Sequence, residues 1–281
     1  MARVALVTGG MGGLGEAVCI KLAALGYTVV TTHSPGNTKA ESWLAAMREQ
    51  GYNFKAYPCD VADYDSAQAC VKQVEQEVGP VDVLVNNAGI TRDRMFLKMS
   101  PEDWQAVIDT NLNSMFNVTK QVVPDMVEKG WGRIVQISSV NGEKGQAGQT
   151  NYSAAKAGMH GFTKALALEV APLGIKVTAV EPGFFRTEFL DPSSVRYGAN
   201  VIEDYAAQGS IAQTYGAYKG RQLGDPAKLA AAVRALADIA APPRRFLAGS
   251  DAVAMAEAEL EARRNDMAAM RALSLSTDHG D

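Results

Sequence analysis

The stretch VALVTGGMGGLGEAVCIKLAAL, residues 4–25, decides the fold of this chain. Val4–Thr8 is a short apolar run rich in β-branched residues, which is typical of a buried strand. A glycine-rich turn follows at once, and in Glu16–Leu25 the apolar residues recur at helical spacing. Glycines let a phosphate approach the backbone, and the N-terminus of the next helix offers free N–H groups to an anion. Because a tight turn alone would not need so many glycines, the stretch predicts a dinucleotide-binding strand–turn–helix unit.

Further apolar runs of strand length alternate with helix-like segments along the chain. The next expected strands are Thr28–Thr32, Phe54–Tyr57, Val81–Val85, Gly132–Ile137 and Lys176–Val180. The expected helices between and after them are Asp63–Val78 with Asp63 as N-cap, Asp103–Lys129 with a bend near Pro124, Tyr152–Leu173 and Asp225–Ile239. This alternation predicts an α/β fold of Rossmann-like type, a doubly wound parallel sheet with helices on both faces.

The composition excludes several classes of protein. The chain has 281 residues, is 47% hydrophobic and 21% charged, and carries a net charge of −4, without a basic stripe for nucleic acid. No apolar run approaches the ~18–20 residues of a membrane helix, and we expect no signal peptide. Three scattered cysteines indicate reduced thiols in a cytoplasmic protein. His33, His160 and His279 are too far apart in sequence to suggest a metal site, so we expect ordinary surface positions and no metal.

Ser139, Tyr152 and Lys156 form the candidate catalytic group. A tyrosine and a lysine four residues apart lie on one face of a helix. A free phenol titrates near pH ~10, and an ammonium within roughly 4–6 Å can lower that pKa by about 1–3 units. A serine hydroxyl aimed at the same point can hold a substrate oxygen while a proton moves. The alternative is a chance pair on a solvated helix face.

The spacing Thr8-Gly9-x-x-x-Gly13-x-Gly15 and the NNAG sequence at 86–89 resemble the short-chain dehydrogenase/reductase family. The resemblance implies that Tyr152 protonates a ketone oxygen, with Lys156 lowering the pKa of the tyrosine and binding the nicotinamide ribose. It also implies that Ser139 orients the carbonyl and that Asn111 holds a proton-relay water. The alternative for Asn111 is a polar core residue that bonds its own helix.

The cofactor expected from the second strand is NADP(H). An acidic residue after that strand would bind the ribose hydroxyl of NAD(H), but the chain reads Thr32-His33-Ser34 and its first acid is Glu41. Lys39 could reach the NADP(H) phosphate, or it is an ordinary exposed lysine. The residues expected at the cofactor, several through the resemblance alone, are Gly9, Met11, Gly12, Gly13, Leu14, Gly15, His33, Ser34, Lys39, Asp60, Val61, Asn87, Ala88, Gly89, Tyr152, Lys156, Pro182, Gly183 and Thr187.

Within the family, residues 1–180 resemble bacterial acetoacetyl-CoA reductases. This implies NADPH-dependent reduction of a 3-oxoacyl-CoA to the (R)-3-hydroxyacyl-CoA, as in polyhydroxyalkanoate biosynthesis, with Gln146 and Gln149 at the substrate and Lys98 near a CoA phosphate. Ala147 and Phe184 also line the expected acyl pocket, where the reductases commonly have an aromatic residue and a tyrosine. The alternatives are a reductase of another ketone, a reductase of 3-oxoacyl chains on a carrier protein, and a silent NADP(H) sensor.

Beyond Val180 the chain resembles a different branch of the same superfamily. In that branch a strand at Arg245–Ala248 completes a sheet of about seven strands, and a helix at Ala252–Ala272 follows. We expect one domain over 1–250, in which 184–222 form a substrate lid, and a helix and tail over 251–281. The expected lid aromatics are Phe184, Phe185, Phe189, Tyr197, Tyr205, Tyr215 and Tyr218. We expect a homotetramer or homodimer that binds a ketone or acyl-CoA and neither nucleic acid nor membrane, with Asp225–Ile239 at an interface or covering the sheet.

Overall fold

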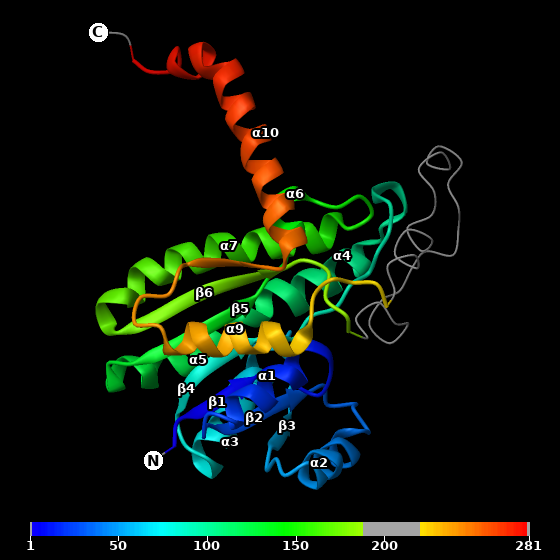
Figure 1. Ribbon diagram of the computed structural model, residues 1–281, viewed down its shortest axis with the longest axis vertical. Helices are drawn as coiled ribbons and strands as arrows, with labels where there is room; N and C mark the ends of the chain where they lie inside the picture. The colour runs from blue at the N-terminus through cyan, green and yellow to red at the C-terminus, as the bar shows by residue number, and fades with distance from the viewer. Residues whose placement is uncertain (1, 188–219, 280–281) are drawn as a thin grey trace.

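The computed structural model describes residues 2–187 and 220–279, and the sheet at its centre has seven parallel strands (Figure 1). The strands run in the order β3-β2-β1-β4-β5-β6-β7, so the direction of winding reverses between β1 and β4. Ligands of open α/β sheets bind at such a reversal, beyond the carboxyl ends of the strands. The strands are β1 Val4–Val7, β2 Thr28–His33, β3 Lys55–Pro58, β4 Val81–Asn86, β5 Gly132–Ile137, β6 Ile175–Pro182 and β7 Arg245–Ala248. The predicted doubly wound fold is confirmed.

Helices cover both faces of this sheet (Figure 1). One apolar core joins the sheet to α1, α2 and α9, and a second joins it to α3, α5 and α7. Side chains alternate between the two cores along each strand: Leu6 faces one, and its neighbours Ala5 and Val7 face the other. The helices are α1 Gly13–Ala23, α2 Ala40–Glu49, α3 Tyr64–Glu77, α4 Pro101–Ile108, α5 Ser114–Lys129, α6 Asn141–Lys144, α7 Thr150–Val170, α9 Pro226–Asp238 and α10 Ser250–Leu275. The apolar strand runs are therefore buried on both sides.

The long helix expected at Asp103–Lys129 is interrupted, but not where the sequence indicated. The helical run begins at Pro101 and changes to a π-helical turn at Asp109–Asn113 before α5 begins. Pro124 lies inside α5, so the expected bend there is not the point at which the helical pattern changes. The π-helical turn contains Asn111, whose side-chain amide donates to the carbonyls of Val107 and Ile90 at 2.9 Å each. A side chain that bonds backbone carbonyls in this way accompanies the widened turn.

The C-terminal part adds two packed elements and one projecting helix. α9 packs against α1 and buries Leu229 and Val233. Of the two alternatives expected for this segment, an interface helix and a helix that covers the sheet, the structure shows the second. α10 begins against the body and then extends away from it (Figure 1), with residues 260–279 exposed. Within 2–187 and 220–279, no helix combines the length and apolarity that a membrane crossing needs. Most of the expected lid, including Phe189, Tyr197, Tyr205, Tyr215 and Tyr218, lies outside the described residues.

Candidate active site

The turn between β1 and α1 forms a cradle whose shape depends on glycine. Gly9 and Gly13 have φ of 63° and 56°, a backbone region that residues with side chains rarely adopt. A side chain at Gly15 would place its Cβ 2.6 Å from the amide nitrogen of Asn87, whereas Gly12 faces open space. The cradle is therefore tightly packed beneath and open above, at the N-terminus of α1. This is the arrangement that a pyrophosphate requires.

The end of β4 is fastened to the same turn by hydrogen bonds. The Asn87 side chain donates to the carbonyls of Thr8 and Gly9 at 3.0 Å each. In return, the Thr8 hydroxyl accepts from the backbone N–H groups of Asn87 and Ala88, also at 3.0 Å. The NNAG sequence thus holds the ends of two adjacent strands in register, and its small residues leave the space beside them free.

A cavity of about 670 Å³ opens along this edge of the sheet, from β2 to β6. This volume lies in the range of small-molecule sites. Most predicted site residues line the cavity: Gly9, Met11, Gly12, Gly13, Leu14, His33, Ser34, Asp60, Val61, Asn87, Ala88, Gly89, Asn111, Ser139, Gln149, Tyr152, Lys156, Pro182, Gly183, Phe184 and Thr187. Of the others, Gly15 lies under the cradle, and Lys39, Lys98, Gln146 and Ala147 are not among the lining residues.

The end of the cavity beside β2 and β3 has few charges. Asp60 is the one carboxylate among the described residues that line the cavity. Lys39 is exposed at the N-cap of α2, and its backbone N–H donates to the side chain of Asn37 at 2.7 Å. Asn37 also lines the cavity. It was not predicted as a site residue, because asparagine is frequent in ordinary turns.

Ser139, Tyr152 and Lys156 all line the cavity, and Tyr152 interacts with both of the others. The ammonium of Lys156 lies 5.4 Å from the centroid of the Tyr152 ring and donates to the carbonyl of Ile137 at 2.8 Å. Burial lowers the pKa of Lys156 to about 7. Burial also raises the pKa of Tyr152 well above its ordinary value, while a hydrogen bond with Ser139 acts in the opposite direction. The expected lowering of the tyrosine pKa is thus not found here, and the phenol is protonated at neutral pH.

Asn111 enters the cavity from the π-helical turn. Its side-chain nitrogen has two carbonyl partners, whereas its oxygen is buried without a hydrogen-bond partner among the described residues. A Cβ on Gly89 would lie 2.6 Å from that oxygen. A buried acceptor facing a glycine, beside the catalytic group, fits the predicted water-holding role.

Asp93 was not predicted from the sequence; it does not line the cavity itself but bonds Gln149, which does. It is 2% exposed, and burial raises its pKa to about 6. The amide of Gln149 donates to Asp93 at 2.9 Å, and Gln149 accepts from Asn141 at 3.0 Å. Gln149 is therefore bonded at both ends of its amide, next to the position where a substrate is expected. A buried aspartate in a loop carries no periodic signal, so only its proximity to Gln149 in the fold identifies it.

The C-terminal segment supports the far side of the cavity. The backbone N–H of Phe184 donates to the carboxylate of Asp251, at the start of α10, at 2.7 Å. The N–H of Gly183 donates to the carbonyl of Ala248 at the end of β7. A side chain on Gly183 would collide with Asp251. Gln222, which is buried and lines the cavity, is a second residue from this part that sequence reasoning missed.

His160 is the one histidine whose expected surface position is wrong. It is 4% exposed on α7 and lies one turn beyond Lys156. The fold brings Glu143 and Glu181 to it, with donor and acceptor atoms all within 4.8 Å of one another. The wide spacing of the three histidines in the sequence does not indicate this cluster, because its members come together only in the fold.

Comparison with known proteins agrees with this geometry. Residues 3–197 match the family model for short chain dehydrogenases. The chain is 57% identical over 188 residues to an acetoacetyl-CoA reductase of Cupriavidus necator, covering 67% of this chain and 76% of that protein. It is 39% identical over 248 residues to the 3-oxoacyl-[acyl-carrier-protein] reductase FabG of Vibrio harveyi, covering 88% and 93%.

The structural comparison extends over the C-terminal part as well. The crystal structure of a short-chain dehydrogenase from Streptomyces avermitilis matches with a TM-score of 0.89 and 33% identity, covering 99% of this chain and all of that one. The reductase with 57% identity, in contrast, matches 188 residues of this chain. The identity is thus higher over the front part of the chain, and at lower identity the similarity extends into the C-terminal part, both for the carrier-protein reductase and for the solved dehydrogenase.

Proposed function

The chain belongs to the short-chain dehydrogenase family, and we propose that it reduces acetoacetyl-CoA or a related 3-oxoacyl-CoA to the (R)-3-hydroxyacyl-CoA with NADPH. The family and the curated relatives indicate an oxidoreductase that acts on CH–OH groups. The observation that carries the proposal is the meeting of Ser139, Tyr152 and Lys156 in the cavity that the glycine cradle also lines. The proposal includes the role that such reductases have in polyhydroxyalkanoate biosynthesis.

In the proposed reaction Tyr152 gives its phenolic proton to the ketone oxygen. A phenol holds its proton at neutral pH, so Tyr152 can act as the acid in the direction of reduction. Ser139, hydrogen-bonded to Tyr152, donates to the same oxygen and stabilises the charge that develops there. NADPH, when bound, supplies the hydride that the ketone carbon receives.

Lys156 and Asn111 complete the group. With a pKa of about 7, Lys156 exchanges protons readily at neutral pH and can return one to the tyrosine after turnover. The buried oxygen of Asn111 can hold a water that joins the lysine to solvent. The nicotinamide ribose would lie against Lys156, with Pro182, Gly183 and Thr187 on the opposite side of the cavity.

The preference for NADPH rests on the end of β2. His33, Ser34 and Asn37 line the cavity there, and none of them would repel a phosphate as a carboxylate does. Lys39 stands exposed next to them and can extend toward an added phosphate. The proposal treats the cofactor as NADP(H) and the enzyme as a cytoplasmic homotetramer or homodimer, with free, buried cysteines that suit a reducing compartment.

A second candidate substrate is a 3-oxoacyl chain on a carrier protein. It is favoured by the similarity to the Vibrio harveyi carrier-protein reductase, which extends over 88% of this chain. Gln146 and Ala147, which were expected at the acyl group, do not line the cavity, so they favour neither substrate.

The test is the oxidation of NADPH, followed by absorbance, with acetoacetyl-CoA, acetoacetyl carrier protein and a CoA-free 3-oxo ester as competing substrates. The proposal predicts the highest kcat/KM for acetoacetyl-CoA with NADPH, an (R)-configured product, and a much lower value with NADH. A higher kcat/KM for the carrier-bound chain would select the second candidate. A lack of turnover with all three would reject both.

A further inference from the structure

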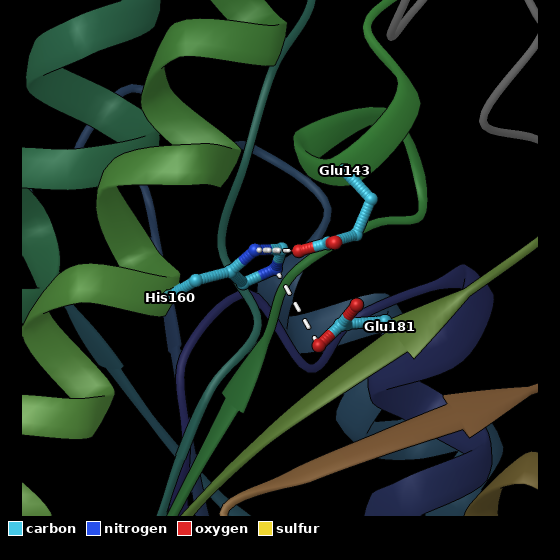
Figure 2. A group of neighbouring side chains, drawn as sticks. All are labelled: Glu143, His160 and Glu181. Carbon is cyan, nitrogen blue, oxygen red and sulfur yellow. Dashed lines mark ion pairs between the residues drawn. The ribbon is translucent and has the colours of Figure 1, made fainter. Parts of the chain in front are cut away.

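A cluster of charged groups connects α7, the helix that carries Tyr152 and Lys156, with α6, β6 and β7. Figure 2 shows the imidazole of His160 between two carboxylates, Glu143 from α6 and Glu181 from β6. The distances are 3.0 Å from Nδ1 to Glu143 and 3.7 Å from Nε2 to Glu181. Glu181 and His160 are buried, whereas Glu143 and Arg245 are partly exposed, so the cluster extends from the interior to the surface.

Arg245 neutralises much of this negative charge from β7. Its guanidinium donates to both oxygens of Glu181, at 2.5 and 2.6 Å, and also pairs with Glu143. Glu143, His160 and Glu181 have the composition of a metal site, but the guanidinium occupies the oxygens that a metal ion would need. The cluster is better understood as a hydrogen-bonding network centred on an imidazole.

The network reaches the catalytic group through Ser138. The Ser138 hydroxyl lies 2.9 Å from Nε2 of His160 and 3.1 Å from the backbone carbonyl of Lys156. A hydroxyl has one proton and can donate to only one of these acceptors. Ser138 precedes Ser139 at the end of β5, so the choice affects the backbone that holds both the catalytic serine and the catalytic lysine.

We propose that His160 is a positioning residue whose protonation state decides which partner receives the proton of Ser138. When the imidazole is neutral, its Nδ1–H donates to Glu143 and its Nε2 accepts the Ser138 proton. When the imidazole is charged, its Nε2–H donates to the Ser138 oxygen, and the Ser138 proton turns to the carbonyl of Lys156. The neutral arrangement holds Ser139 and Lys156 in the geometry for turnover, and acidification disturbs it. The effect on turnover rests on the proposed function.

The groups facing the imidazole decide where the change occurs. Glu143 on α6 and Glu181 on β6 favour the charged imidazole, whereas burial and Arg245 on β7 favour the neutral one. Burial is the largest of these causes and lowers the pKa of His160. Of the other charged groups nearby, Lys156 lies on the same helix, and Asp251 on α10 bonds Phe184 instead of the ring.

The first measurement is an NMR titration of the imidazole protons, made simple by the three histidines of the chain. The signal missing from His160→Gln assigns the buried ring. The proposal expects a titration midpoint below the usual histidine value, about 6.5, and a further fall of about one unit in Glu143→Gln. Glu169→Gln, which removes an exposed carboxylate from the same helix, should leave the midpoint unchanged.

The second measurement is the pH dependence of kcat/KM and of NADPH affinity. Lys156 and Asp93 titrate in the same range, so the readout is the difference between variants. Wild type should lose up to about tenfold in kcat/KM per pH unit below the imidazole midpoint, a decline that His160→Gln and Ser138→Ala lack. His279→Gln, in the exposed tail, should retain the wild-type profile.

Three results would overturn the proposal: an imidazole still charged at pH 7.5, a midpoint unaffected by Glu143→Gln, or an unchanged acid decline in His160→Gln. If His160 has only a structural role, His160→Gln should lower kcat/KM by the same factor at every pH and leave the acid decline unchanged. The titration needs no ketone. Absence of turnover with acetoacetyl-CoA would therefore reject the proposed function, while the titration and NADPH affinity would still decide the role of His160.

Discussion

Lys156 is buried, 4% exposed, and its ammonium donates to the backbone carbonyl of Ile137. Its pKa is about 7 in the folded protein and about 10.4 in an unfolded chain. Between these values the unfolded state binds the additional proton, so the stability of the wild type rises with pH. The burial of Lys156 therefore lowers the stability of the folded protein most below pH 7.

We accordingly predict that Lys156→Met stabilises the cofactor-free protein while it abolishes turnover. Its free energy of unfolding at pH 6 should exceed that of the wild type by roughly 2–4 kcal/mol, with a smaller difference at pH 9. Urea unfolding at the two pH values measures this directly. Lys164→Met, an exposed lysine on the same helix, is the matched control and should change stability little. A destabilised Lys156→Met variant would show that the ammonium has stronger partners than the structure gives it.

Asn111 shows how far a single residue could be understood from the sequence. A polar residue within a long helical pattern indicated a special role, and the family resemblance supplied a water. The amide nitrogen bonds backbone carbonyls, one of them in its own helical run, as the alternative expected, whereas the water at the buried oxygen stays a prediction. The π-helical segment orients this oxygen toward Gly89. The orientation could not be predicted from the sequence, because it involves a hydrogen bond to Ile90 in a distant loop.

At the scale of this element, Asn111→Ala should lower kcat by about 10–100-fold and the free energy of unfolding by about 1–3 kcal/mol. The loss has two causes: two buried carbonyls lose a donor, and the proton relay loses its acceptor. Asn113→Ala is the control, because Asn113 lies in the same π-helical turn but is exposed and bonds only Asp109. Steady-state kinetics and thermal unfolding of both variants give the comparison. Equal effects from both would contradict a special role for Asn111.

The connection from β2 to α2 is the element that should select the cofactor. Lys39→Glu places a carboxylate beside the expected phosphate position and should reduce the kcat/KM ratio of NADPH to NADH by about tenfold or more. Lys55→Glu, at an exposed site on β3, controls for the change in net charge. An unchanged NADPH/NADH ratio in Lys39→Glu would assign the preference to His33, Ser34 and Asn37 instead.

Most strands of the sheet were predictable because each contains a short run rich in apolar, β-branched residues next to polar or glycine residues. β5 occupies Gly132–Ile137, the range that the sequence indicated, and Asp63 caps α3 as expected by accepting from Ser66 at 2.7 Å. Features that depend on partners distant in sequence were not predictable. The cluster around His160 also contains residues from α6, β6 and β7. These elements are distant in sequence, so no local pattern predicts the cluster.

At the scale of the whole molecule, the C-terminal part acts as a support for the active site. Arg245 from β7 joins α6 to β6, and Asp251 at the start of α10 holds the turn at Gly183 and Phe184. The sequence showed that this part resembles another branch of the superfamily, but the residues it would contribute to the cavity had no visible motif. A substitution in β7 can therefore act on the catalytic group without touching the cofactor.

The projecting half of α10 gives a prediction for the whole chain. Its residues 260–275 are exposed, including Leu260, Met267 and Leu273. Deletion of residues 260–281 should change the melting temperature by no more than about 2 °C and leave kcat unchanged, because the segment is not packed into the core. Ala256→Asp, which introduces a charge at a buried position of the same helix, should be clearly destabilising. A large loss of stability on deletion would show that a further copy of the chain covers the segment.

The central claim is that Tyr152 donates the proton to the ketone oxygen in a site that binds the cofactor independently of it. The most direct test is Tyr152→Phe, which removes one hydroxyl and retains the buried ring, assayed for turnover of acetoacetyl-CoA and for NADPH affinity by fluorescence. We predict a loss of kcat of at least about 10³-fold with NADPH affinity within about threefold of the wild type. Turnover within tenfold of the wild type, at unchanged NADPH affinity, would contradict the claim.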